Sequence, residues 1–396
     1  MMSNWDIKKL GEVLSIERGG SPRPIKKYLT NSSDGINWIK ISDATASEKY
    51  IYETKEKITR DGLHKTRVVN EGDFILSNSM SFGRPYIMKT TGCVHDGWLV
   101  LKQNGKKLFE TEFLYYLLSS PYVFKQFNYL AAGSTVRNLN IALVSSVQVP
   151  IPPIPEQKRI VKILDKAFVA IDKAKANAEK NLQNSRELFD SYLNKVFANP
   201  GKDWEEKKLG DVCNIIGGGT PAKSTSKYYT GNIPWATVRD MKFDVLATTA
   251  FCITEKAIKE SSSNLIPRNN VIIATRVGLG KVCILSNDTA INQDLKGILP
   301  KKKNGLGASY LFYWFKSISK IIEANGVGAT VKGVKIPFIE SLKIPFPNLF
   351  AQKQIVNNLD EISLDTKKLE SIYQQKLADL EELKKSILQE AFDGEI

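Results

Sequence analysis

Basic and polar side chains gather in Gly- and Pro-rich stretches that occur twice in the 396-residue sequence. Lys and Arg form ion pairs with phosphate groups, while Arg, Asn, Ser and Thr donate hydrogen bonds to the edges of bases. Loops on a rigid scaffold commonly carry such binding residues. The candidates for contact with nucleic acid are Ser21, Arg23, Lys26, Arg84, Arg137 and Asn138 in the first half, and Thr220, Lys223, Arg239, Arg276, Lys281 and Lys332 in the second.

Arg276 is the most favourable of these candidates. Thr275 and Arg276 follow a predicted buried strand and precede a Gly turn, so the arginine would stand on a rigid platform. For each candidate taken singly, an ordinary solvated surface role is the alternative interpretation.

The positive charge of the chain is concentrated in two large segments. The whole chain carries +14, of which residues 1–153 contribute +6, from 20 basic and 14 acidic residues. Residues 201–347 contribute +9, from 21 basic and 12 acidic residues, whereas residues 348–396 carry −4. This distribution favours a polyanionic partner for the two large segments. A basic protein whose charge only aids solubility is the alternative.

Signatures of catalysis are sparse. The sequence contains no G-x-x-x-x-G-K-[ST], no G-x-S-x-G, no H-E-x-x-H and no Asn/Asp-Pro-Pro-aromatic tetrapeptide. Its two histidines leave little material for a metal site. The four cysteines are scattered, which predicts buried free thiols in a reducing compartment. We therefore expect a binding protein without catalytic residues, cofactor or metal.

Two long predicted helices must position the candidate residues. The segment 149–168 reads VPIPPIPEQKRIVKILDKAF, and segment 344–362 repeats its prolines, its Gln-Lys pair and its apolar spacing. In each copy a proline-stiffened extended segment leads into a helix, predicted over residues 155–199 and 349–392. The first copy has Glu156 near the start of its helix where the second has Ala351, which predicts a looser start for the second helix.

The remainder of the chain is duplicated in the same order. The phrase WDIKKLGEV at residues 5–13 returns as WEEKKLGDV at 204–212, and further pairs follow throughout both halves. Each half shows short apolar strands and a late helix, which indicates a mixed domain of common size. Trp38 and Trp235 are expected to pack in the cores rather than to stack on an extruded base.

These patterns predict an α+β fold in which two pseudo-symmetric domains are joined by an antiparallel two-helix coiled coil. The expected boundaries are residues 1–153 for the first domain, 154–200 for the first helix, 201–347 for the second domain and 348–396 for the second helix. The chain has neither an apolar signal segment nor a membrane-spanning run, so we expect a cytoplasmic protein.

The ordered duplication, the P-x-P-x-x-x-x-Q-K entry into each helix and the final KSILQEAFDGEI resemble the specificity subunit of type I restriction–modification systems. The resemblance covers essentially the whole chain. It implies that each domain recognises one half of a split double-stranded DNA target. It also implies that the two helices set the gap between the half-sites and dock two methyltransferase subunits, which restriction subunits join.

Two other function classes remain open from the residues alone. One is a DNA methyltransferase or nuclease with its own degenerate active site, which methyl-transfer assays on the purified chain would detect. The other is a coiled-coil scaffold without a DNA role, which the basic domains disfavour.

Overall fold

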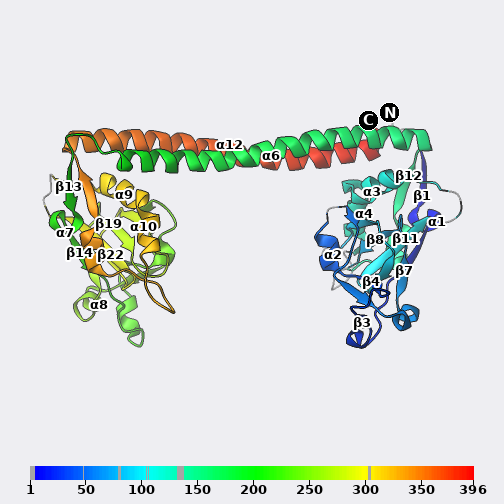
Figure 1. The fold of residues 1–396 in the computed structure, drawn as a ribbon, viewed down its shortest axis with the longest axis horizontal. Helices are drawn as coiled ribbons and strands as arrows, with labels where there is room; N and C mark the ends of the chain where they lie inside the picture. The colour runs from blue at the N-terminus through cyan, green and yellow to red at the C-terminus, as the bar shows by residue number, and fades with distance from the viewer. Residues whose placement is uncertain are drawn as a thin grey trace. The chain divides into compact units, whose positions relative to one another are not determined.

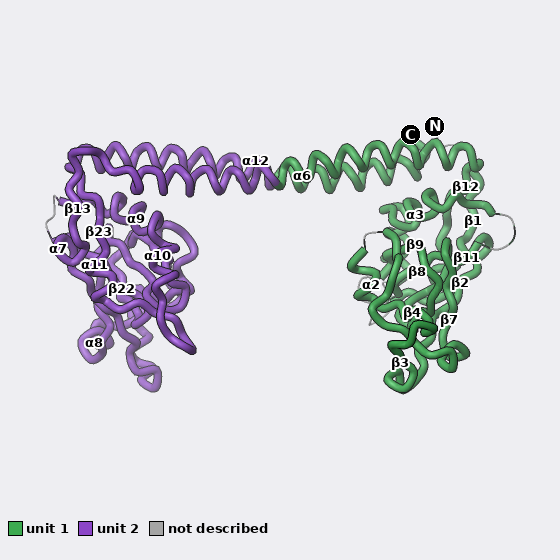
Figure 2. The backbone as a smooth tube through the Cα atoms, in the orientation of Figure 1, with its two compact units in different colours: residues 1–179, 375–396 green, residues 180–374 purple. Residues whose placement is uncertain are grey.

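The structure is a computed structural model of the chain that describes residues 5–47, 49–78, 82–103, 105, 107–131, 138–301 and 305–396. It divides into two compact units, residues 1–179 with 375–396 and residues 180–374, which Figure 2 shows in different colours. Each unit contains a sheet-rich domain and part of both long helices (Figure 1). The mixed helix and strand content confirms the predicted α+β class.

Unit 1 contains two larger sheets and one strand pair. One sheet has the order β2 (Leu14–Arg18), β11 (Trp98–Gln103), β8 (Phe74–Ser77), β9 (Pro85–Met88) and β5 (Tyr50–Ile51). The other has the order β3 (Leu29–Thr30), β6 (Glu56–Ile58), β4 (Ile36–Ile39), β10 (Gly92–Val94) and β7 (Arg67–Val69). The pair is formed by β1 (Asp6–Lys9) and β12 (Gln148–Ile151). Helices and short 3-10 helices connect these strands: α1 (Leu10–Val13), η1 (Ile25–Lys27), α2 (Ile41–Thr45), η2 (Arg60–Lys65), α3 (Thr111–Ser119), α4 (Pro121–Ala131) and α5 (Ile141–Ser146).

Unit 2 repeats this plan. The sheet β14 (Cys213–Gly217), β22 (Leu295–Pro300), β19 (Val271–Ala274), β20 (Val282–Leu285) and β16 (Val245–Leu246) matches the first sheet of unit 1 strand for strand. The second sheet has the order β17 (Phe251–Ile253), β15 (Ile233–Ala236), β21 (Thr289–Ile291) and β18 (Asn264–Ile266), and β13 (Glu205–Lys208) pairs with β23 (Lys343–Phe346). The helical elements are α7 (Leu209–Val212), η3 (Ser226–Tyr229), η4 (Val238–Asp240), α8 (Glu255–Lys259), α9 (Ala308–Ser317), α10 (Ser319–Ala324) and α11 (Ile336–Ser341).

The central strands β8 and β19 are almost entirely apolar because both of their faces are buried. In β8, Phe74 and Leu76 pack in the cluster that includes α3, while Ile75 packs in a second cluster with residues of β4 and β10. Successive side chains of a strand point to opposite faces, so one strand serves two cores. In β19, residues 271 and 273 pack on one side and residues 272 and 274 on the other. Each half therefore contains a short central strand that packs against a separate core on each of its faces.

The two long helices are α6 (Ile154–Ala198) and α12 (Leu349–Asp393), of 45 residues each. In unit 1, Lys175 pairs with Glu381 at 2.6 Å and Lys384 with Asp172 at 3.5 Å. A step forward along α6 thus corresponds to an equal step back along α12, which confirms the predicted antiparallel pairing. In unit 2, the Arg186–Glu370 pair at 3.1 Å follows the same one-for-one register.

A buried glutamine locks the start of each long helix. Gln157 accepts a hydrogen bond from the N–H of Glu110 at 2.7 Å and donates to the carbonyls of Leu108 and Pro152, each at 2.8 Å. Gln352 likewise accepts from the N–H of Gly307 and donates to the carbonyls of Gly305 and Pro347. Each glutamine thereby ties the proline segment and the helix to the loop before α3 or α9.

We expect Gln157→Leu to lower the free energy of unfolding by about 3 kcal/mol, since each buried polar group left without a partner costs ~1–3 kcal/mol. The measurement is the unfolding midpoint of the full chain in a thermal melt. Gln183→Leu on the same helix is the matched control, because Gln183 is exposed and bonds only Glu187 among the described residues. Equal midpoints for the two variants would contradict the structural role of Gln157.

The expected looser start of α12 is wrong. Asn348 lies just before the helix, and its Oδ1 accepts the N–H of Ala351 at 2.9 Å. Asn is among the best N-cap residues because it satisfies a backbone N–H that the first turn leaves free. Sequence reasoning looked for a carboxylate at position 351 and overlooked the amide three residues earlier.

Candidate nucleic-acid interface

A pair of crossing loops forms the same contact in each domain. In unit 1, the N–H of Gly20 donates to the carbonyl of Val94 at 3.1 Å, and the Ser21 hydroxyl donates to Asp96 at 2.5 Å. In unit 2, the N–H of Gly219 donates to the carbonyl of Ile291 at 3.0 Å, and the Thr220 hydroxyl donates to Gln293. The repeated Gly-Gly-[Ser/Thr]-Pro segment therefore crosses the loop that follows β10 or β21.

Glycine is required where these loops cross. A Cβ atom at Gly19 would lie 2.1 Å from the carbonyl oxygen of His95, and one at Gly218 would lie 2.2 Å from that of Asn292. Such distances are far below van der Waals contact, so a side chain would push the two loops apart. The close approach gives each domain a stiff platform.

In each domain a third segment forms hydrogen bonds with the crossing loops. Its residue at the contact is Asn78 in unit 1 and Thr275 in unit 2. The backbone N–H of Asn78 donates to the carbonyl of Gly97 at 3.1 Å, and its side chain donates to the carbonyl of Asp96 at 2.9 Å. The carbonyl of Asn78 accepts the N–H of Leu139 at 2.8 Å. In unit 2, Thr275 bonds Asp294 and Val334 through the equivalent backbone groups. We call residues 19–24, 77–78, 94–97 and 138–139 loop edge 1, and residues 218–223, 275–281, 291–294 and 327–334 loop edge 2.

Loop edge 1 contains several of the residues predicted from sequence. Ser21 forms the crossing contact, and Arg23 lies 3.8 Å from Asp96 with 83% of its side chain exposed. Asn138 directly precedes Leu139, whose N–H donates to Asn78. Arg84 directly precedes β9, and its guanidinium lies over the ring of Tyr86, 5.3 Å from the ring centroid. Lys26 lies exposed in η1, outside the edge. Arg137 lies outside the described residues.

Loop edge 2 also contains predicted residues. Thr220 forms the crossing contact, and Arg276 pairs with Asp294 at 3.5 Å. The backbone N–H of Lys281 donates to the carbonyl of Gly278 and closes the turn between β19 and β20. Lys332 directly precedes Gly333, which forms a β-bridge with Arg276. Of the remaining two, Arg239 lies in η4, whose Val238 adjoins the turn at Gly278, and Lys223 lies exposed after Pro221.

Sequence reasoning missed the groups at the centre of each edge. These groups are Asp96, His95, Asn78, Gln293 and Asp294, none of which is among the residues predicted from sequence. Alignment of the two halves by their Gly-Gly-[Ser/Thr]-Pro segments and central strands would have placed residues 94–97 opposite 291–294. That repeat was the available signal.

The two edges differ in electrostatics. The Ser21 hydrogen bond, with a smaller contribution from Arg23, lowers the pKa of Asp96, so its carboxylate stays charged. Burial lowers the pKa of His95, which favours the neutral ring, and the N–H of Gly97 donates to its Nδ1 at 2.9 Å. The neutral imidazole therefore carries its hydrogen on Nε2. Burial also lowers the pKa of Lys296, which follows loop edge 2.

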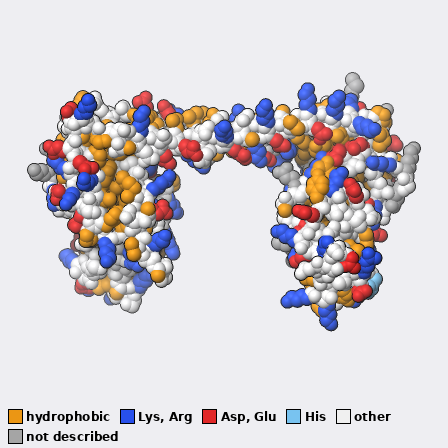
Figure 3. All heavy atoms as spheres, in the orientation of Figure 1, with side chains coloured by type: hydrophobic (Ala, Val, Ile, Leu, Met, Phe, Trp, Pro, Cys, Tyr) orange, Lys and Arg blue, Asp and Glu red, His pale blue; other side chains and the backbone are white. Residues whose placement is uncertain are grey.

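An open pocket of about 610 Å³ adjoins loop edge 1. Trp38 forms part of its wall but is only 4% exposed, and Trp235 is 5% exposed, so both tryptophans pack in the cores as expected. In Figure 3, Lys and Arg side chains stand out at the end of unit 1 that carries β3. The other residues that line the pocket include Ser21, Arg23, Lys40, Glu56 and His95.

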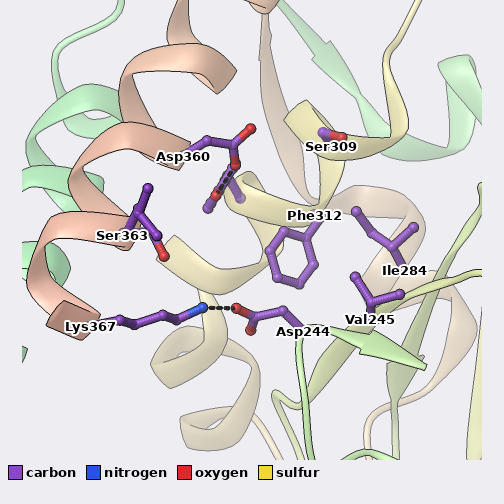
Figure 4. Close-up of a pocket in the computed structure, with 10 residues that line it drawn as sticks. Asp244, Val245, Ile284, Ser309, Phe312, Asp360, Ser363 and Lys367 are labelled. Carbon is purple, nitrogen blue, oxygen red and sulfur yellow. Dashed lines mark hydrogen bonds and ion pairs between the residues drawn. The ribbon is translucent and has the colours of Figure 1, made fainter. Parts of the chain in front are cut away.

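The carboxylates near the long helices are engaged in structural contacts. Figure 4 shows a pocket of about 350 Å³ in unit 2, where Asp244 pairs with Lys367 of α12 at 3.2 Å. Burial raises the pKa of Asp244, but its bonds to Lys316 and Lys367 outweigh this and lower the pKa overall. Asp360 accepts a hydrogen bond from Tyr313, as Asp165 does from Tyr116 at 2.5 Å in unit 1. These groups hold the domains on their helices.

The cysteines are free thiols. Cys93, Cys213 and Cys283 are buried, and burial raises the pKa of Cys93 to about 11 and that of Cys213 and Cys283 to about 12. Cys252 is only partly buried, contrary to the expectation for all four.

Within the described part of the chain, every helix is too short or too polar to cross a membrane.

Comparison with known proteins gives one consistent family. The family model "Type I restriction modification DNA specificity domain" matches residues 2–181 and again 201–381. The putative type I restriction enzyme MjaX specificity subunit of Methanocaldococcus jannaschii is 27% identical over 99% of this chain and 94% of its own length. The MjaIX specificity subunit of the same organism is 30% identical over 45% of this chain, and the Escherichia coli EcoR124I/EcoR124II specificity subunit is 31% identical over 54%. The chain spans about half the length of these last two, 42% and 55% respectively.

Two solved structures have the same fold. A chain from a study of complex assembly and conformational transition of the type I R-M system superposes with a TM-score of 0.81, at 22% identity over the full length of both chains. The HsdS subunit from Thermoanaerobacter tengcongensis gives a TM-score of 0.64, at 21% identity over 99% of this chain and 97% of that one. At these identities the likeness establishes the architecture.

Proposed function

Since the chain belongs to the family of type I restriction–modification DNA specificity domains and carries two matches to it, we propose that it is the non-catalytic DNA-recognition subunit of a type I complex. Each domain would bind one half of a bipartite, asymmetric duplex target. The observation that carries this proposal is the recurrence of one loop edge in both domains.

The two edges share their backbone contacts but present different side chains. Ser21 and Asp96 in the first domain correspond to Thr220 and Gln293 in the second, and Asn78 corresponds to Thr275. A carboxylate accepts a hydrogen bond from cytosine N4, whereas a glutamine amide pairs with adenine N6 and N7. One scaffold with two chemical surfaces suits a target whose halves differ in sequence.

The chain would consist of four functional segments. Residues 1–153 and 201–347 would be the two recognition domains, and residues 154–200 and 348–396 would be the helices between and after them. The helices would dock two methyltransferase subunits, to which restriction subunits would bind in the cytoplasm. Exposed apolar side chains on α6 and α12 support a protein partner there: Val169 at 70%, Leu188 at 54%, Leu364 at 56% and Ile372 at 58% exposed.

The direct test is a methylome of cells that express the methyltransferase subunits with or without this chain. We expect methylation at one bipartite sequence only when the chain is present, and none from the purified chain alone. A chain variant with Gly19→Val and Gly218→Val, which would force the loop edges apart, should lose that methylation. Gly217→Val is the control and should retain it, because a Cβ at Gly217 would meet only the end of the Lys296 side chain, at 3.9 Å. Methyl transfer by the chain alone would favour the enzyme alternative.

A further inference from the structure

A short hairpin, residues 327–333, forms part of loop edge 2 and is joined to Arg276. The N–H groups of Val327 and Gly333 each donate to the other residue's carbonyl at 3.0 Å, which closes the hairpin. Gly333 also forms a β-bridge with Arg276, and the N–H of Val334 donates to the carbonyl of Thr275 at 2.9 Å. The hairpin, the orange loop beyond α10 in Figure 1, is therefore hydrogen-bonded to the end of β19, and we call the two segments together the ribbon.

The ribbon exposes apolar and basic side chains together. Val327 is 81% exposed and Val331 is 41% exposed, while the neighbouring Lys332 is exposed as well. Val277 in the adjoining turn is 55% exposed and has a φ of 29°. A β-branched residue rarely adopts a positive φ, and such strain persists where the surrounding structure imposes it. Apolar groups beside cations fit a groove that offers methyl groups between phosphates.

The Arg276 side chain forms an ion pair with Asp294 and is otherwise partly exposed to solvent. Its guanidinium lies 3.5 Å from Asp294, and 49% of its side chain is exposed, against 17% for Asp294. Asn292 donates to the Asp294 carboxylate at 3.1 Å, and the carbonyl of Asp294 accepts the N–H of Thr275 at 2.9 Å. Because the carboxylate is fixed and the guanidinium is a rigid fork, the remaining N–H donors point in a defined direction.

We infer that the ribbon formed by residues 275–281 and 327–334 enters the major groove of the half-site bound by the second domain. Arg276 donates to O6 and N7 of one guanine, Asp294 positions it, and Val327 contacts the groove wall. This inference rests on the proposed function. The major groove accepts a two-stranded ribbon, and the Arg–guanine contact is the commonest specific one.

The test uses the chain assembled with its methyltransferase subunits and duplexes that carry each single base-pair change in the target. Methylation rates give the discrimination at every position. Arg276→Lys keeps the charge but loses the bidentate fork, and Arg276→Gln removes both. We expect each to lower discrimination at one G·C pair by roughly 5- to 150-fold and to leave the other positions within about twofold.

Asp294→Asn is the test of positioning. It should relax the same G·C pair and no other, and Arg276→Gln with Asp294→Asn should relax it no further than Arg276→Gln alone. Lys208→Gln removes an exposed charge from β13, outside loop edge 2, and should change no position. Unfolding midpoints within a few degrees of the wild type establish that each variant is folded.

Two outcomes separate the inference from the proposed function. If the wild-type complex methylates a bipartite target but the Arg276 variants weaken all duplexes equally, Arg276 contacts only phosphate and the inference fails. If the wild-type complex shows no sequence preference at all, the proposed function itself fails.

Discussion

Replacement of residues 201–347 by the second domain of a relative with a different target is expected to change one half of the methylated sequence completely and to leave the other half unchanged. The reason is that the second domain has two cores formed by its own residues and a loop edge built from its own residues. It contacts the helices in unit 2 through the hydrogen bonds of Gly307 with Gln352 and of Tyr313 with Asp360, through the Asp244–Lys367 ion pair, and through a third core that it shares with both helices.

The chimera is designed around those contacts. The donor domain should carry a tyrosine at the position of Tyr313, and any residue except proline at that of Gly307, so that Asp360 keeps its hydroxyl partner and Gln352 its backbone N–H. Methylome mapping reads the result. The reciprocal exchange of residues 1–153 is the matched control and should alter only the half that the first chimera keeps. A change of both halves in either chimera would mean that the domains read DNA jointly.

Matched deletion of residues 176–182 from α6 and 374–380 from α12 is expected to bring the two half-sites closer without changing their sequences. Seven residues shorten a helix by about 10 Å, which corresponds to roughly three base pairs at 3.4 Å each. The deletion joins Lys175 to the residue after the gap and keeps Glu381 opposite it, so the ion pairs Lys175–Glu381, Lys384–Asp172 and Arg186–Glu370 are all retained. A seven-residue step also nearly preserves the apolar register.

Deletion of residues 176–182 alone is the control. This single deletion leaves seven residues of α12 without partners on α6. It also shifts the ion pairs between α6 and α12 on one side of the deletion out of register, so we expect loss of the assembled complex. Methylome mapping of the matched deletion gives the spacing. Because the deletion also rotates one end of the helices by about 20° relative to the other, the gap need not shorten by the full three base pairs. A functional matched variant with the original spacing would show that the helices do not set the gap.

The sequence alone determined the duplication, the α+β class and the two long antiparallel helices. These features depend on local information: a proline segment ends regular structure at once, and apolar residues at spacings of three and four define a helix face within a few turns. For this reason the predicted helices at 155–199 and 349–392 agree with α6 and α12 to within a residue at each end.

Only the tertiary structure decided which polar residues meet. Ser21 bonds Asp96 across 75 positions of the chain, and Thr220 bonds Gln293 across 73. Sequence periodicity carries no information about such contacts, since they depend on how strands from distant segments are ordered in the sheets. Arg276 was placed correctly on a rigid turn, but its partner Asp294 became visible only when β19 and the loop after β21 came together. The physical reason is that a loop edge is built by long-range backbone hydrogen bonds between sheets, whereas a helix is built by bonds four residues apart.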